Sequence, residues 1–246
     1  MNLHHTVVVV TGASDRIGRA IAQAFAQKGA SVVVHCHTDI EHARQTVNMI
    51  REAGGDATIC TADLTSIEGV DKLVHHTLQS YGRWNILINA ASVFHSVSLE
   101  NLTPEQFQND HLLHQMAPFF LSRALYLHRK EAGEIGGGCV VNLTDTGIRK
   151  PVPSRPSYYS AKSSLEHQTI ILGKAMAPYV RINAVAPGAV LPARKEDNEY
   201  FSRLEQQLPM KKLATVAQVV NAVLFLCEND AVTGQTIVVD GGEHLQ

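Results

Sequence analysis

The 246-residue chain has few cysteines, few aromatic side chains and little net charge. Its four cysteines (Cys36, Cys60, Cys139 and Cys227) are scattered, which fits reduced core thiols better than a disulfide framework. The net charge of −2 supplies no basic field, so neither nucleic acid nor an anionic membrane is an expected partner. No apolar run approaches the roughly 20 residues of a membrane span.

The sequence also lacks a flexible linker, a block of charge, a low-complexity stretch and an internal repeat. We therefore expect a single domain over residues 1–246. Residues 1–5 lead straight into a strand and leave no room for a signal peptide, which predicts a cytoplasmic protein.

Strand-like and helix-like segments alternate along the whole chain. Residues 6–11 (TVVVVT) form an apolar, β-branched run typical of a strand buried on both faces of a parallel sheet. Further strands are predicted at residues 31–35, 58–61, 85–89, 139–143, 180–185 and 236–239. Helices are predicted at residues 17–28, 42–52, 67–81, 104–130 with a break near Pro118, 158–176 and 216–227. This order predicts an α/β fold with a Rossmann-like, doubly wound parallel sheet of about seven strands, whose ligand binds beyond the carboxyl ends of the strands.

A glycine-containing loop, TGASDRIG at residues 11–18, follows the first strand and opens a helix. Gly12 permits the tight turn and Gly18 permits close packing of the helix. The helix N-terminus then offers free N–H groups to a pyrophosphate, which predicts a dinucleotide site. An ordinary strand-to-helix turn is the alternative for this feature alone.

The end of the second strand bears on which dinucleotide binds. NAD usually requires a carboxylate there for its ribose 2′-OH, but the usual acidic position holds Cys36. His37, Thr38 and Arg16 could instead donate to a 2′-phosphate, which favours NADPH. Aspartates at positions 15 and 39 oppose that preference.

The same stretch suggests a zinc site as an alternative. His35 and His37 lie two apart on a strand and are expected to face the same side. Zinc needs three or four converging ligands, and the sequence offers no second cluster with suitable spacing.

Tyr158 and Lys162 lie four residues apart and so share one face of a helix. The lysine ammonium, with a cationic nicotinamide, is expected to lower the pKa of the tyrosine, which is ordinarily about 10. A surface pair is the alternative. Asp145 ends the preceding strand region, thirteen residues before the tyrosine, and its carboxyl group could hold and pass on a proton.

A set of motifs spread over nearly the whole chain is specific in combination. The set consists of the glycine loop, Asp63, Asn89-Ala90-Ala91-Ser92, Tyr158 with Lys162, Pro187-Gly188 and Val239-Asp240-Gly241-Gly242. Together these motifs resemble a short-chain dehydrogenase/reductase. The resemblance implies catalysis by Asp145, Tyr158 and Lys162. It implies cofactor contacts from Gly12, Arg16, Ile17, Gly18, His37, Thr38, Asp63, Asn89, Ala90, Ser92, Tyr158, Lys162, Pro187 and Gly188.

Within that family, Arg16 stands where a glycine is common, Phe94 follows Ser92, and Asp145 replaces a serine. This combination is similar to the pteridine reductases, including the dihydromonapterin reductases. The similarity implies that Phe94 stacks a pterin against the nicotinamide and that Arg16 lies by the cofactor phosphates and the substrate. It also implies that Ser92, Asp145 and Tyr158 hydrogen-bond pterin or cofactor. A simple core aromatic is the alternative for Phe94.

Two further positions are informative. His114 occupies the place where many family members carry an asparagine that holds a water in the proton relay, and a helix histidine capping a backbone group is the alternative. The run after Pro187 is short, and the loop at about residues 189–210 is expected to contact the substrate tail.

The sequence thus predicts an NADPH-dependent reductase of dihydropterins, namely dihydrobiopterin, dihydromonapterin or dihydrofolate. Hydride would pass to a pterin C=N bond, and Tyr158 with Asp145 would deliver the proton. One alternative is a reductase of 3-oxoacyl thioesters or other carbonyls, and a second is a non-catalytic NADP(H)-binding sensor. The family resemblance also implies a homotetramer that pairs through the long helix and the Tyr158 helix, with the C-terminal strand at a second interface.

Overall fold

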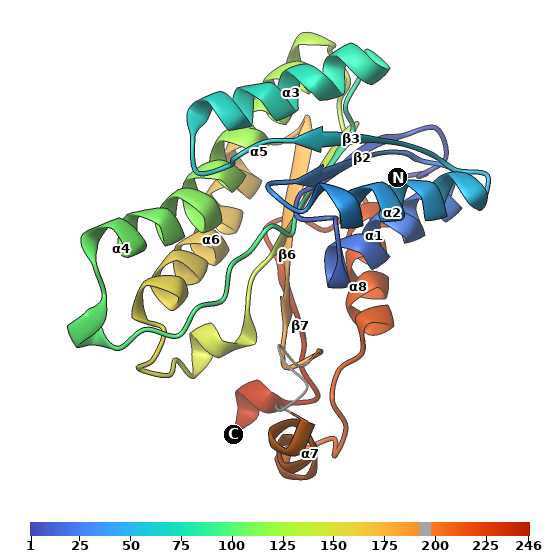
Figure 1. Cartoon of the computed structure of the whole chain (residues 1–246). Coiled ribbons are helices and arrows are strands. Elements are labelled where there is room, and N and C mark those ends of the chain that lie inside the picture. Colours follow the sequence, from blue (N-terminus) through green and yellow to red (C-terminus); the bar gives the residue numbers. More distant parts are fainter. Residues whose placement is uncertain (192–197) are drawn as a thin grey trace.

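The computed structural model describes residues 1–191 and 198–246 (Figure 1). Seven parallel strands form one sheet in the order β3-β2-β1-β4-β5-β6-β7, which confirms the predicted doubly wound sheet. The strands are β1 (Val7–Val10), β2 (Ser31–Cys36), β3 (Asp56–Thr61), β4 (Ile86–Asn89), β5 (Gly138–Leu143), β6 (Val180–Pro187) and β7 (Thr236–Val239). The strand order reverses between β1 and β4, and a crevice for ligand is expected beyond their carboxyl ends.

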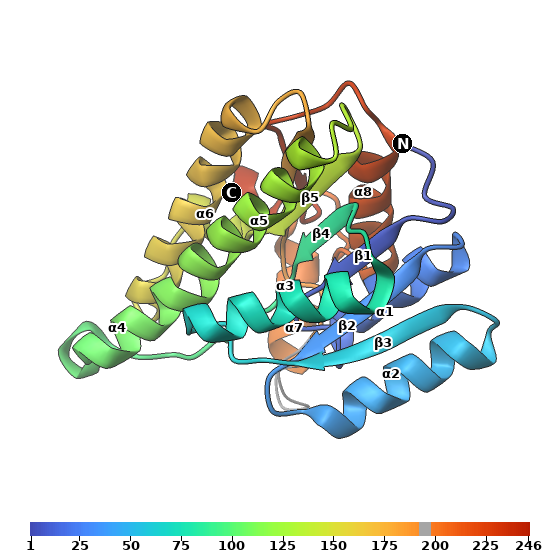
Figure 2. The same ribbon diagram turned by 90° about the horizontal axis from the view of Figure 1, so that it is seen from above.

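Helices cover both faces of the sheet (Figures 1 and 2). They are α1 (Arg16–Gln27), α2 (Ile40–Glu52), α3 (Ile67–Tyr81), α4 (Pro104–His111), α5 (Ala117–Glu131), α6 (Pro156–Ala175), α7 (Asn198–Gln207) and α8 (Val216–Glu228). Helices α1, α2 and α8 pack on one face, and α3, α5 and α6 pack on the other. None of the helices in the described ranges is long and apolar enough to cross a lipid bilayer.

Strand β1 consists of four valines because helices cover both faces of the sheet. Val8 and Val10 belong to the core under α1, α2 and α8, whereas Val9 belongs to the core under α3, α5 and α6. All three are fully buried, because successive side chains of a strand point to opposite faces and both faces are apolar here.

The long helix is interrupted near Pro118, as the sequence predicts. Helix α4 ends at His111, residues Leu112–Met116 form a turn of π-helix, and α5 begins at Ala117. The N–H group of Ala117 bonds the carbonyl of Leu112, five residues back. Pro118 has no N–H to donate, and the interruption takes the form of a wider helical turn just before it.

Helix α7 is a correction to the sequence analysis, which treated residues 189–210 as loop. Part of that stretch, residues 192–197, lies outside the described residues. In α7, Leu204 is buried, and Leu208, just beyond the helix, is also buried. Phe201, Leu204 and Leu208 follow a helical spacing in the sequence, which the prediction of a loop overlooked.

Candidate functional site

The loops after β1, β2, β4, β5 and β6 hold the residues singled out from the sequence. In a parallel sheet these loops all emerge at the same edge, so the topology brings segments that are far apart in the chain together. Three parts of this edge are distinct: the glycine loop, the end of β2, and a cluster around Tyr158.

The glycine loop fits a dinucleotide phosphate. Gly12 has φ of +62°, and a Cβ atom there would lie 2.7 Å from the Cα of Ala91. A Cβ atom on Gly18 would lie 2.1 Å from the carbonyl oxygen of Gly12, so only glycine lets α1 start this close to the loop. The N-cap residue Asp15 makes no side-chain hydrogen bond to the first turn of α1. The first N–H groups of α1 therefore have no side-chain cap from Asp15 and suit an anion.

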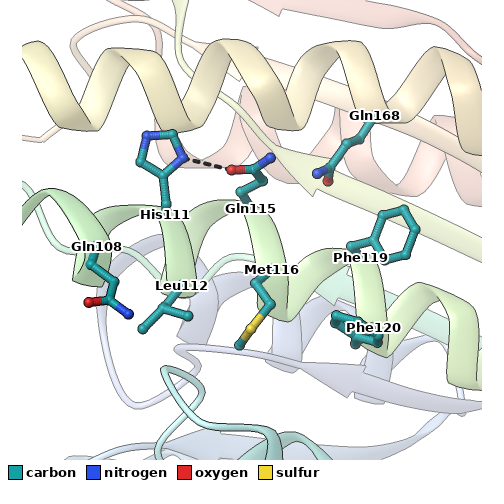
Figure 3. Close-up of a pocket in the computed structure, with 8 residues that line it drawn as sticks. All are labelled: Gln108, His111, Leu112, Gln115, Met116, Phe119, Phe120 and Gln168. Carbon is teal, nitrogen blue, oxygen red and sulfur yellow. Dashed lines mark hydrogen bonds between the residues drawn. The ribbon is translucent and has the colours of Figure 1, made fainter.

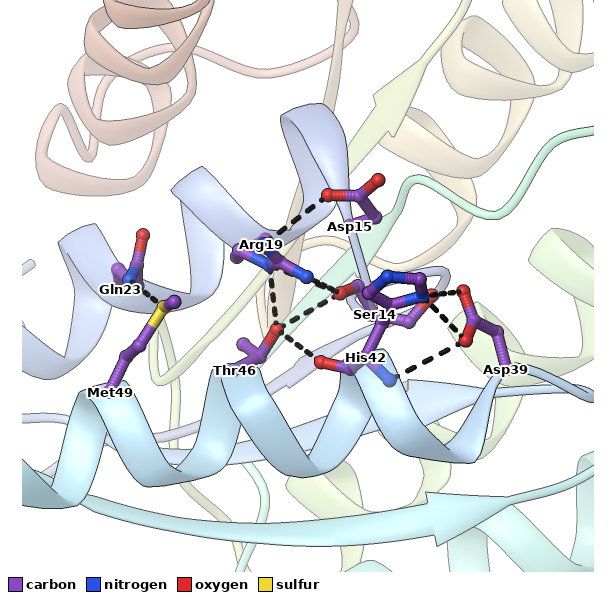
Figure 4. A network of polar contacts seen from close by, with 8 residues as sticks. All are labelled: Ser14, Asp15, Arg19, Gln23, Asp39, His42, Thr46 and Met49. Atoms are coloured by element: carbon purple, nitrogen blue, oxygen red, sulfur yellow. Dashed lines mark hydrogen bonds and ion pairs between the residues drawn. The ribbon is translucent and has the colours of Figure 1, made fainter.

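Polar contacts tie this loop to the neighbouring helices (Figure 4). The guanidinium of Arg19 donates to the carbonyl oxygen of Ser14 at 2.7 Å and lies 3.4 Å from the carboxylate of Asp15. Asp39 accepts from the ring of His42 at 2.8 Å and caps the start of α2. Both aspartates that oppose NADPH binding in the sequence thus have local partners, which weakens that objection.

His35 supports the glycine loop from the end of β2. Its Nδ1 accepts the N–H of Gly12 at 3.2 Å, and its Nε2 lies 3.0 Å from the carbonyl oxygen of Ala62. A carbonyl can only accept, so Nε2 carries the proton. Burial lowers the pKa of His35 to about 4, and the ring is neutral near pH 7.

His37 lies beyond the end of β2 and is exposed, with Nε2 3.9 Å from Oδ2 of Asp63. Thr38 follows it and is also exposed. Hydrogen bonds from the N–H and the hydroxyl of Thr65 lower the pKa of Asp63. No group of three or more His, Cys, Asp or Glu side chains that could hold a metal occurs within the described ranges.

The end of β4 is fixed by buried polar groups. The amide of Asn89 donates to Oδ1 of Asn142 at 2.8 Å, while its own Oδ1 is buried without a partner in the described structure. The hydroxyl oxygen of Thr11 accepts the N–H groups of Ala90 and Ala91 at 2.9 and 3.0 Å. The predicted residues Asn89 and Ala90 therefore hold the ends of β1, β4 and β5 in register.

Tyr158 and Asp145 form the centre of the third part of this edge, the cluster around Tyr158. The phenol of Tyr158 donates to Oδ2 of Asp145 at 2.8 Å, and Oδ1 of Asp145 accepts the N–H of Gly147 at 2.6 Å. Burial, followed by the charge and the hydrogen bond of Asp145, raises the pKa of Tyr158 well above its ordinary value, although a hydrogen bond from Ser92 opposes the shift. The expectation that lysine would lower this pKa is therefore not met by the protein groups.

Lys162 is buried one helical turn beyond the tyrosine. Its ammonium donates to the carbonyl oxygen of Leu143 at 2.7 Å and lies 5.8 Å from the ring centre of Tyr158. Burial lowers the pKa of Lys162 to about 8, with Asp145 acting in the opposite direction. The pair predicted from its spacing is thus a buried pair and not a surface one.

His114 lies in the π-helical turn and is buried against this cluster. Its Nδ1 lies 2.9 Å from the carbonyl oxygen of Asp110 and carries the proton. Its Nε2 accepts the N–H of Val93 at 3.3 Å and lies 3.0 Å from the hydroxyl of Ser92. Burial lowers the pKa of His114 to about 3. These contacts favour the capping role, in which a neutral histidine holds the backbone that follows β4.

Phe94 projects from the same loop and is 48% exposed, so it is not a core aromatic. Its ring packs edge to face on Tyr158, with 4.9 Å between ring centres. The guanidinium carbon of Arg155 lies 3.9 Å from the centre of the Phe94 ring. Phe94 thus presents an apolar surface directly beside the Tyr158–Asp145 pair.

The turn after β6 closes the site on its other side. The N–H of Gly188, after Pro187, bonds the carbonyl oxygen of Val239 at 3.0 Å. Glu243 accepts the N–H of Ala189 at 3.3 Å, and burial raises the pKa of its carboxyl group. Arg16 donates to the carbonyl oxygen of Leu191 at 3.0 Å, so this arginine extends from the start of α1 to the turn after β6.

Two residues of this region were missed in the sequence. Arg155 and Glu243 belong to no motif, and their positions depend on the packing of two loops against the site. The only available signal for Arg155 was its place three residues before Tyr158, which is not specific.

A hollow of about 380 Å³ lies elsewhere, on the outer face of α4, the π-helical turn, α5 and α6 (Figure 3). His111 and Gln115 form a hydrogen bond of 2.6 Å there, and with Gln168 they lie between the α4–α5 segment and α6. The residues that line this hollow do not include Tyr158, Asp145 or Phe94, so we do not assign it to the chemistry.

The chain is similar to known oxidoreductases in sequence and in structure. A family model described as enoyl-(acyl carrier protein) reductase matches residues 12–244. An uncharacterised oxidoreductase of Thermotoga maritima is 30% identical over 253 residues, which cover 98% of each chain. The structure of FolM alternative dihydrofolate reductase 1 from Brucella suis, in complex with NADP, is 32% identical with a TM-score of 0.92 and covers 100% of this chain and 97% of its own. The NADP-bound angucycline C-6 ketoreductase LanV is 29% identical with a TM-score of 0.89, covering 100% and 98%.

Proposed function

Because the chain belongs to the short-chain dehydrogenase/reductase family of oxidoreductases, we propose that it reduces dihydropterins with NADPH. The observation that carries the proposal is the hydrogen bond of 2.8 Å between Tyr158 and Asp145, which lies beside the exposed ring of Phe94. A flat aromatic side chain suits a flat heteroaromatic substrate, and a carboxyl group behind the tyrosine suits delivery of a proton to a ring nitrogen.

The residues present fit NADPH. The uncapped start of α1 and the tight loop at Gly12 suit its pyrophosphate. His37 and Thr38 are exposed at the end of β2, and the carboxylates of Asp15 and Asp39 have other partners, which suits a 2′-phosphate. NADPH supplies the hydride when bound. The solved FolM and LanV structures both contain NADP, which supports this cofactor.

Tyr158 and Asp145 provide the proton. A raised pKa keeps the phenol of Tyr158 protonated near pH 7, so Tyr158 can act as the donor to the substrate nitrogen. Asp145 then returns a proton from solvent to the phenolate along their hydrogen bond. Ser92 and His114 hold the loop that bears Phe94 and thereby fix the substrate ring relative to Tyr158.

A ketone or 3-oxoacyl thioester is the second candidate substrate. The likeness to LanV, named as a ketoreductase, favours it, and the likeness to FolM, named as a dihydrofolate reductase, favours the pterin. Asp145 and the exposed Phe94 favour the pterin, because a carboxyl group behind the tyrosine suits proton delivery to a ring nitrogen and an exposed ring suits stacking of a pterin.

The test is NADPH oxidation with dihydrobiopterin, dihydromonapterin, dihydrofolate and an acetoacetyl thioester as separate substrates. Turnover of the pterins with none of the thioester is the expected result. Turnover of the thioester alone would reject the proposal in favour of the ketoreductase. Tight NADPH binding without oxidation of any substrate would favour a non-catalytic sensor.

We also propose a homotetramer that pairs through the outer face of α4, α5 and α6. This face combines the hollow of Figure 3 with exposed apolar side chains at Phe107, Phe120, Leu127, Ile170 and Ile171. Strand β7 is one of the two edge strands of the sheet and offers the second interface. Light scattering on a sizing column should give about four times the 26.8 kDa chain mass.

A further inference from the structure

We propose that Arg155 binds an acidic group in the tail of the substrate, so that a pterin with a carboxylate tail is preferred to one with a neutral tail. The inference rests on the proposed dihydropterin reduction. It starts from the position of Arg155, the residue just before α6, whose guanidinium carbon lies 3.9 Å from the ring centre of Phe94. The guanidinium therefore lies over one face of the Phe94 ring, and a substrate ring that packs against the rest of Phe94 has a cation beside it.

The second observation is an unused donor. The Nε–H group of Arg155 is buried and has no acceptor within the described ranges. No ion pair joins Arg155 to a carboxylate in the same part of the chain. An unpaired buried donor is costly, and this cost is relieved if the guanidinium turns towards an acceptor that a ligand supplies.

The carboxylates nearest the site already have other partners. Asp145 accepts from Gly147 and Tyr158, and Glu243 accepts from Ala189. Arg155 therefore differs from Arg149, which lies on the same stretch before α6 and pairs with Glu166 at 2.8 Å. Arg149 carries the same charge without the contact to Phe94 and is the matched control.

The neighbouring backbone holds Arg155 in place. The carbonyl oxygen of Ser154 accepts the N–H of Val97 at 2.8 Å and the hydroxyl of Ser96 at 3.3 Å. The segment before α6 is thus attached to the loop that carries Phe94. Arg155 and Phe94 are fixed relative to each other, and a planar guanidinium suits a carboxylate through paired hydrogen bonds.

The experiment compares dihydrofolate, whose tail ends in a glutamate, with dihydrobiopterin, whose short tail carries only hydroxyl groups. We expect Arg155→Gln to lower kcat/KM for dihydrofolate by about tenfold or more and to change kcat/KM for dihydrobiopterin by less than about threefold. Arg155→Lys, which keeps the charge, should retain part of the preference, and Arg149→Gln should leave the ratio of the two substrates unchanged.

Three outcomes would overturn the inference. An equal loss for both substrates in Arg155→Gln would mean that Arg155 only supports Phe94. An unchanged ratio in a variant that still reduces both pterins would mean that the tail does not reach Arg155. If the wild-type protein reduces neither pterin, the proposed function itself fails, and that result is distinct from a change in ratio.

Discussion

Replacing Asp145 by asparagine separates a proton relay from a structural role. The carboxylate accepts two hydrogen bonds, from Tyr158 at 2.8 Å and from the N–H of Gly147 at 2.6 Å. Asparagine has nearly the same shape and can still accept the Gly147 bond as the cap of the short helical turn Thr146–Arg149. It cannot take up a proton and pass it to the phenol.

A proton relay and a structural role predict different losses of kcat and of the free energy of unfolding in this variant. Loss of general acid–base assistance should lower kcat by about 10²- to 10⁴-fold, or about 3–5 kcal/mol in the activation free energy. Because the cap is kept, the free energy of unfolding should change by no more than about 1 kcal/mol. For a chain of this length that corresponds to a shift in Tm of about 2–4 °C or less.

The assay measures kcat with dihydrobiopterin, the Kd of NADPH by fluorescence titration, and Tm. Asp230→Asn is the matched control, since Asp230 is exposed on the loop that precedes β7, at the opposite edge of the sheet. Equal losses of turnover and of cofactor affinity in Asp145→Asn, or a large fall in Tm, would refute the relay and assign Asp145 a structural role.

Four more predictions follow from the same site. Phe94→Leu should raise KM for dihydropterin by about tenfold with a smaller effect on kcat, because stacking contributes about 0.5–1.5 kcal/mol beyond the buried area; steady-state kinetics checks this. His114→Leu leaves the Val93 N–H without its acceptor and should cost about 1–3 kcal/mol in urea unfolding, with a parallel fall in kcat/KM. The free-enzyme profile of kcat/KM should fall as pH rises through about 8, where Lys162 loses its charge, and an unchanged rate at pH 9.5 would contradict this. The folded pKa of His35 (about 4) lies below its unfolded value, so His35 should cost about 3 kcal/mol of stability as pH falls from about 6.5 towards 4; His35→Gln should remove that share of the pH dependence in denaturant titrations and leave the share of His114.

The sheet could be predicted from the sequence because its strands are buried on both faces. A strand such as β1 then reads as a continuous apolar run, and the alternation with helices leaves little freedom in the topology. The break near Pro118 could be predicted but its π-helical form at Leu112–Met116 could not, and helix α7 was missed. The form of the turn depends on how the helix accommodates Pro118, which has no N–H to donate. Helix α7 has a helical spacing of apolar residues, but it is short and lies in a stretch that was treated as a substrate loop.

The residues of the site could be placed because parallel strands end at one edge, but their electrostatics could not. Spacing puts Tyr158 and Lys162 on one helix face and suggests that lysine controls the pKa of the tyrosine. The structure places the Asp145 carboxylate in direct contact with the phenol and turns the ammonium of Lys162 to Leu143. The direction of the shift depends on these contacts and on burial, which a one-dimensional pattern does not contain.

Two buried histidines make contacts that the sequence pattern does not reveal. The chain has thirteen histidines, and the sequence singles out His35 by its spacing from His37 and His114 by its place in the family pattern, but it does not show that the two make the same kind of contact. Both are buried, both donate to one backbone carbonyl, and both accept one backbone N–H. His35 joins the glycine loop to the end of β3, and His114 joins the loop after β4 to the end of α4. A neutral imidazole can bridge a donor and an acceptor at once, which neither a lysine nor a carboxylate can do. Two such bridges hold the cofactor side and the substrate side of the site, and both weaken when the rings are protonated in acid.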